Sequence, residues 1–202
     1  MRMKSTLRSS ILSVALVSLA LAIGCSTPMS EPAYYLMRGE APETNGRLDG
    51  PIRVGIGRLI VAPYLLSNQG IVIEAAPGEV RAARQHQWAE PVDAGLRWFL
   101  SAEITKALGD QVGGGLIDRG DWDYTIDVYV ARLHGTMSGK AVLDATYVIR
   151  PSAESEKQRE YRFSKSQSQS DEGYAALVAA EQSLVSELGV SIAASLSERM
   201  AP

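Results

Sequence analysis

The sequence predicts an α+β protein, a two-layer sandwich in which an antiparallel or mixed sheet carries two main amphipathic helices on one face. Two observations lead to this prediction. Apolar residues recur at helical spacing within 86–108 and within 174–196, and the segments 122–131 and 141–149 alternate apolar and polar residues with a period of two. Helices with one apolar stripe and strands with one apolar face bury those surfaces against each other, which gives two layers.

The N-terminal 24 residues have the pattern of a secretory signal peptide. Arg2, Lys4 and Arg8 form a basic start, and a nearly unbroken apolar run covers 11–23. An apolar segment of this length, after a charged lead and before small residues, is too short for a transmembrane helix. We therefore expect residues 1–24 to be removed from the mature chain.

Cys25 is the only cysteine in the chain, and it follows Gly24 directly after the apolar run. This arrangement resembles the bacterial lipobox, although Ala22 stands where leucine is usual. The resemblance implies acylation of Cys25 and a tether over residues 25–33. By resemblance to sorting in Gram-negative lipoproteins, Ser26 implies the outer membrane, with the domain on its periplasmic face. The alternative is an ordinary cleaved signal that leaves a free thiol.

The mature chain is acidic. The whole sequence has a formal net charge of −3, and removal of three positive and no negative charges with residues 1–24 lowers it to −6. An acidic chain without a cluster of Lys or Arg argues against nucleic-acid binding. Residues 34–202 have the length of a single domain with a substantial core.

Residues 52–62 form the first strong strand of the prediction, and Val54, Ile56 and Ile60 share one parity within it. Gly55 and Gly57 interrupt the other parity, and glycine inside a strand often marks a bulge or a close backbone approach. The glycine pair lacks the third glycine of a dinucleotide-binding loop and the Gly-Lys-Ser/Thr of a phosphate loop, which argues against nucleotide binding.

The remaining elements follow from spacing and turn residues. We expect a β-prone island at 34–37, a loop at 38–51, a hairpin of 71–74 and 79–82, a helix that leads in through Pro91 and ends near Gly109, strands at 122–131, 141–149 and 159–165, and a closing helix from Tyr174 to Leu196. Residues 134–139 are expected to form a turn with a solvated His134, and residues 164–171 a solvated Ser/Gln-rich tract.

Nothing in the sequence indicates catalysis or a metal site. Neither His86 nor His134 has further ligands at metal-binding spacing, and no Gly-x-Ser-x-Gly elbow occurs. Asp121, Asp123 and Asp127 share one strand parity, which is typical of the wet face of a half-buried strand. We therefore expect no catalytic residue, no metal, no cofactor and no enzyme activity.

Two apolar segments have no obvious place in the predicted core. Tyr64, Leu65 and Leu66 follow Pro63 where the first long strand ends, and Trp88 stands just before the first helix. Exposed clusters of aromatic and aliphatic side chains mark contacts with partners or lipid. The alternative is that these side chains pack under the edge of the sheet.

Several blocks of the chain, in their order, resemble the ABC-type transport auxiliary lipoprotein family. The blocks are the lipobox cysteine, Tyr34-Tyr35-Leu36, Val54-Gly55-Ile56-Gly57, Ala62-Pro63-Tyr64-Leu65, Gln69-x-Ile71-Val72 and Trp88-Ala89-Glu90-Pro91-Val92. The family usually has an Asp-Arg pair before the glutamine, where this chain has Ser67-Asn68. This departure argues against any contact that depends on that charge pair.

The resemblance implies a subunit of an MCE (mammalian cell entry) intermembrane phospholipid transport complex. The implied partners are an MCE-domain protein and ABC transporter subunits, with the lipoprotein anchored in outer-membrane lipid at the end of the transport bridge. A homo-oligomer that matches a ring-forming partner is also implied. The candidate partner-binding residues are Pro63, Tyr64, Leu65, Leu66, Trp88, Glu90 and Pro91. A second hypothesis is a stand-alone lipid- or envelope-polymer-binding lipoprotein, which requires an apolar cavity.

Overall fold

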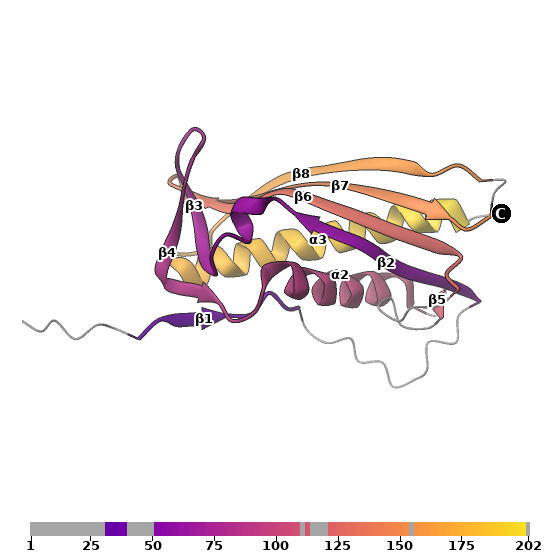
Figure 1. Ribbon diagram of the computed structural model, residues 1–202, viewed down its shortest axis with the longest axis horizontal. Helices are drawn as coiled ribbons and strands as arrows, with labels where there is room; N and C mark the ends of the chain where they lie inside the picture. The colour runs from indigo at the N-terminus through magenta and orange to yellow at the C-terminus, as the bar shows by residue number, and fades with distance from the viewer. Residues whose placement is uncertain (1–30, 40–50, 110–111, 114–120, 154–155, 201–202) are drawn as a thin grey trace, which may run out of the picture. The chain divides into compact units, whose positions relative to one another are not determined.

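The computed structural model describes residues 31–39, 51–109, 112–113, 121–153 and 156–200. The predicted signal peptide, Cys25, and most of the predicted tether and 38–51 loop lie outside these residues. The unit that begins at Pro32 contains a mixed sheet, with the helices α2 (Val92–Leu108) and α3 (Tyr174–Met200) on one of its faces (Figure 1). The predicted α+β two-layer class is confirmed, and the sheet is mixed.

β6 is the strand to which most of the sheet is joined. The described strands are β1 (Ala33–Tyr35), β2 (Ile52–Val61), β3 (Gly70–Ala76), β4 (Glu79–Trp88), β5 (Val112–Gly113), β6 (Tyr124–Thr136), β7 (Lys140–Pro151) and β8 (Arg159–Ser168). β7 pairs antiparallel with β6 along nearly its whole length, so β2 and β3, which are both parallel to β6, share its other edge. β8 extends the sheet beyond β7, while β4 and β1 extend it beyond β3.

β6 confirms the predicted alternation over its first half and departs from it over its second half. The buried side chains of the first half are Tyr124, Ile126, Val128 and Val130, as predicted. A bulge at Ala131 follows, and the strand continues to Thr136, so the turn is shorter than predicted. His134 is therefore a strand residue that is 2% exposed, and the prediction of a solvated histidine is wrong. The ring of Tyr64 packs edge-on against it, with 6.1 Å between ring centroids.

β2 keeps its predicted parity only as far as its own bulge. Val54 and Ile56 are buried, but one extra residue after Ile56 shifts the pairing with β6. Because a shift of one residue moves every later side chain to the opposite face, Ile60 is 50% exposed and does not share the face of Val54, contrary to the prediction. Gly55 lies directly beneath the ring of Trp122, which confirms the expected close approach.

The two helices begin and end close to the predicted residues. Pro91 precedes the first residue of α2, and Gly109 ends the helix with a positive φ of 54°. α3 packs against β6, β7, β8 and α2. Among the described residues, α3 is the one helix with the length and composition to cross a membrane, but half of its apolar window is already buried inside the protein. Its apolar stripe therefore serves the core.

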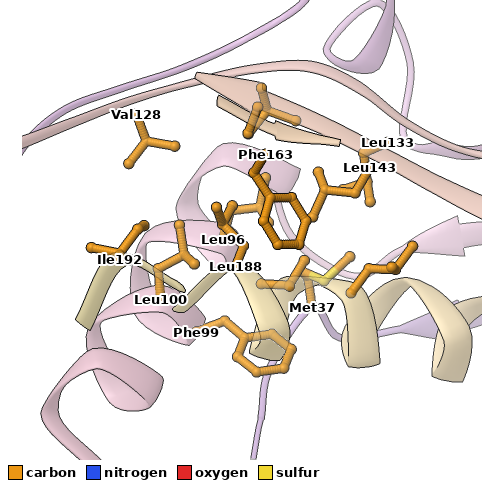
Figure 2. Close-up of a cluster of buried hydrophobic side chains, with 14 of the residues drawn as sticks. Met37, Leu96, Phe99, Leu100, Val128, Leu133, Leu143, Phe163, Leu188 and Ile192 are labelled. Carbon is orange, nitrogen blue, oxygen red and sulfur yellow. The ribbon is translucent and has the colours of Figure 1, made fainter. Parts of the chain in front are cut away.

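The core lies between the sheet and the two helices. Figure 2 shows a cluster of buried side chains that includes Met37, Leu96, Phe99, Leu100, Val128, Leu133, Leu143, Phe163, Leu188 and Ile192. Burial of each large aliphatic side chain contributes about 1.5–3 kcal/mol. Met37 follows β1 and is also in this cluster, so the segment after β1 is fixed to the core.

Candidate functional site

Five of the seven predicted partner-binding residues line one small pocket. The pocket has a volume of about 170 Å³ and lies beside η1 (Pro63–Leu65), a single 3-10 turn after β2, and the end of β4. We call it the η1 pocket. Its lining residues are Leu65, Leu66, Asn68, Gln69, Trp88, Glu90, Pro91 and Val92. Asn68, Gln69 and Val92 were not predicted as site residues, although Gln69 and Val92 belong to the blocks that resemble the family.

The η1 turn forms because Pro63 presets the backbone angle at its first position. The Leu65 N–H donates to the Ala62 carbonyl (2.9 Å), and the Leu66 N–H donates to the Pro63 carbonyl (3.0 Å). The turn buries Leu65 in the core and leaves Leu66 and Pro63 exposed. This single turn therefore places Leu65 in the core and the next residue, Leu66, at the surface.

The predicted site residues divide into a floor and a rim. Leu65 and Trp88 are buried and form the floor of the pocket. The Trp88 N–H donates to the Gln69 carbonyl (2.7 Å), which joins the end of β4 to the segment after η1. Leu66, which is 50% exposed, and Pro91 form the accessible rim. The alternative that these side chains pack inside the protein is therefore correct for Leu65 and Trp88, whereas Leu66 is exposed.

Tyr64 lies beside a short stretch of β6 that has no neighbouring strand on one edge. β2 leaves β6 at Val130 and β3 joins it at Gly135, so the residues between them have no strand neighbour on that edge. The Leu133 N–H in this interval donates to the Tyr64 hydroxyl oxygen (3.4 Å). Burial raises the pKa of Tyr64, so its hydroxyl stays neutral. Tyr64 thus supports the fold beside the η1 pocket and does not line it.

Tyr64→Phe is expected to lower the free energy of unfolding by about 1 kcal/mol, because the Leu133 N–H loses its acceptor while the ring still packs. Urea denaturation of the detergent-solubilised full-length chain measures the loss. Tyr129→Phe is the matched control, because Tyr129 is half-exposed on the outer face of the sheet. Equal losses in the two variants would show that the Tyr64 hydroxyl has no special structural role.

Glu90 closes the rim of the η1 pocket through an ion pair with Arg38. Arg38 donates from Nε to Oε1 (3.0 Å) and from Nη2 to Oε2 (2.7 Å) of Glu90. These hydrogen bonds hold the pKa of Glu90 below its usual range, so the carboxylate stays charged. The exposed pair contributes little stability, but it joins the segment after β1 to the start of α2.

A buried carboxyl that the sequence analysis missed lies on α3. Glu181 is 1% exposed, and its Oε2 atom has no hydrogen-bond partner among the described residues. Burial raises the pKa of Glu181 to about 8, so the folded protein holds this carboxyl protonated at neutral pH. Its position one turn after the buried Leu177, within the apolar stripe, was the available sequence signal.

The carboxylates of the outer sheet face are paired. Asp127 accepts hydrogen bonds from Arg58 and Arg150, and Asp123 accepts one from the Arg53 N–H (2.7 Å). In the part of the chain that the structure describes, no three His, Cys, Asp or Glu side chains gather closely enough to hold a metal ion. These aspartates therefore stabilise neighbouring strands.

The fold and site define a two-layer α+β domain with a small surface pocket, and comparison with known proteins shows its family. The model of the ABC-type transport auxiliary lipoprotein component matches residues 34–193. The chain belongs to this family of transport-associated lipoproteins, which is not an enzyme family. No curated protein matches the chain.

Two solved structures are similar to this chain. A crystal structure of an uncharacterised protein has a TM-score of 0.70 at 20% identity and covers 83% of this chain and 99% of its own. A DUF330-family protein from Xanthomonas campestris has a TM-score of 0.57 at 15% identity and covers 79% of this chain and 92% of its own. At these identities, the likeness shows the fold alone.

Proposed function

We propose that the chain is a membrane-anchored periplasmic lipoprotein of an MCE/ABC-type intermembrane phospholipid transport complex, and that it docks the transport bridge at the outer membrane. The match to the family model over residues 34–193 carries the proposal, because the family is named as an ABC-type transport auxiliary component. The proposal includes a signal peptide over 1–24, acylation of Cys25, one domain over 34–202, and no catalytic role.

The η1 pocket supports a docking role. Binding energy in protein interfaces is concentrated where a few side chains enter well-packed pockets that exclude water. Leu65 and Trp88 provide a rigid apolar floor, and Leu66 and Pro91 provide an accessible rim. The volume of about 170 Å³ is below the roughly 300–1,000 Å³ that is typical of small-molecule sites. The η1 pocket therefore suits an apolar side chain of a partner protein better than a phospholipid.

Leu66→Asp is expected to reduce recovery of the MCE-domain and ABC partners by about tenfold. A carboxylate at the rim loses its hydration when the partner docks, and about 1.4 kcal/mol suffices for a tenfold change. The measurement is affinity purification of the full-length lipoprotein from its native envelope, with mass spectrometry of proteins and lipids. Leu66 is chosen because it is exposed, whereas substitution of Trp88 or Tyr64 would also disturb the fold.

Met137→Asp is the matched control, because Met137 is 73% exposed in the turn between β6 and β7. This variant should recover the partners as the wild type does. Normal partner recovery with Leu66→Asp would overturn the assignment of the η1 pocket. Recovery of stoichiometric lipid and no partner protein from the wild type would overturn the docking role and favour a stand-alone lipid-binding lipoprotein.

A further inference from the structure

An exposed apolar face lies on the described segment that follows the proposed anchor in the chain. Exposure alternates along residues 34–38: Tyr34, Leu36 and Arg38 are exposed, whereas Tyr35 is half-buried and Met37 is buried. Tyr34 is 61% exposed and Leu36 is 47% exposed. The alternation is that of an extended chain whose one face packs on the protein and whose other face is free.

The segment is held firmly to the fold. The Ala89 N–H donates to the Tyr35 carbonyl (2.7 Å), and the Tyr35 hydroxyl forms a hydrogen bond with His86 Nδ1 (3.0 Å). From α3, Gln182 Nε2 donates to the Leu36 carbonyl (2.9 Å). The exposed side chains of Tyr34 and Leu36 are therefore displayed on a fixed edge and do not belong to a loose tail.

We infer that Tyr34 and Leu36 rest in the headgroup region of the phospholipid membrane that holds the anchor. This inference depends on the proposed acylation of Cys25. Tyr34 is the ninth residue after Cys25, and a chain of that length spans at most about 30 Å. Tyrosine favours the membrane interface because its ring is apolar and its hydroxyl is polar, and leucine next to it can enter the acyl boundary.

The charge of this edge does not oppose contact with an anionic leaflet. The mature chain has a net charge of −6, so an anionic leaflet repels most of the domain. Residues 33–38 contain no acidic side chain, and their one arginine, Arg38, is ion-paired with Glu90. Two apolar side chains bind a membrane weakly by themselves, but a short tether raises their effective concentration at the surface to the millimolar range or above.

Depth-dependent quenching on the full-length acylated protein tests the inference. Because Cys25 is the only cysteine and acylation consumes its thiol, Leu36→Cys introduces a single labelling site. The labelled protein is placed in vesicles of phosphatidylethanolamine and phosphatidylglycerol that carry a headgroup-level quencher lipid. We expect quenching at Leu36→Cys to exceed that at Met137→Cys by about threefold or more, because only the first of these two labelled positions lies in the interface.

Flotation of the vesicles separates the two proposals. Protein that floats and shows equal quenching at the two positions would overturn the membrane contact and leave the anchor intact. Protein that does not float would overturn acylation of Cys25, and the membrane contact with it. Quenching at Tyr34→Cys is compared with Met137→Cys in the same way. This second position controls for a local disturbance caused by the label at residue 36.

Discussion

Glu181 is expected to lower the free energy of unfolding of the wild-type protein by about 3.5 kcal/mol between pH 5 and pH 8, and Glu181→Gln is expected to remove most of that fall. Burial raises the pKa of Glu181 in the folded state to about 8 from an ordinary value of 4.5. Between these values the folded chain keeps a proton that the unfolded chain releases, so the free energy of unfolding declines by about 1.4 kcal/mol for each pH unit. This stability is fully present below pH 4.5 and is lost as the pH rises through 8.

Urea denaturation of the detergent-solubilised full-length chain at several pH values measures this effect. Glu198→Gln is the matched control, because Glu198 lies exposed on the same helix. The control should follow the wild-type pH dependence. Parallel curves for the wild type and Glu181→Gln would show that Glu181 titrates near its ordinary pKa in the folded protein. The ion-paired Glu90 does not contribute to the change in stability between pH 5 and pH 8. Its pKa is lowered, so its titration changes the free energy of unfolding only at more acid pH.

Gly189→Leu is expected to lower the free energy of unfolding by about 2 kcal/mol. Gly189 lies where α3 meets α2, and a Cβ atom at this position would lie 2.6 Å from the Cβ of Glu103. A better helix former gains about 1 kcal/mol over glycine, but overpacking a close contact costs about 1–3 kcal/mol and occasionally more. The clash also threatens the hydrogen bond from Ser186 Oγ to Glu103 Oε2 (2.5 Å). The steric cost therefore exceeds the gain in helix propensity.

Val190→Leu provides the comparison, because Val190 is the exposed neighbour of Gly189 on the same helix. Its effect should stay within about 0.5 kcal/mol. Thermal unfolding followed by circular dichroism measures both variants. A neutral or stabilising effect of Gly189→Leu would mean that α2 and α3 can separate at this point without loss of core packing.

The sequence predicted those elements whose pattern continues without interruption. The helix that ends at Gly109, the hairpin around Pro77-Gly78 and the alternation from Tyr124 to Val130 all appear in the structure. The errors at Ile60 and His134 have one kind of cause. Bulges shift the side-chain parity in β2 and in β6. Gly57 was a local signal for the bulge in β2, but the exact position of a bulge depends on the neighbouring strand, and β6 has no such signal at Ala131.

The candidate site was predicted as a set of residues but not as a geometry. Two segments, around Pro63 and around Trp88, were each singled out by their apolar character, and the η1 pocket brings them together. The division into a buried floor and an exposed rim could not be predicted. It depends on how the β3–β4 hairpin brings Trp88 against the turn that follows Pro63. Burial of Glu181 had a local signal, its position within the apolar stripe of α3, which the sequence analysis did not use.

The sequence by itself determined the two-layer class, the order of the elements and the resemblance to a transport lipoprotein family, since periodicity, turn residues and short motifs are local properties. The tertiary structure alone decided that the sheet is mixed, that Tyr64 lies beside the part of β6 between its pairings with β2 and β3, and that Leu66 is exposed whereas Trp88 is buried. Each of these depends on contacts between residues far apart in the chain. Whether a side chain is buried depends on how the sheet and the helices pack together, whereas periodicity is present in the sequence itself.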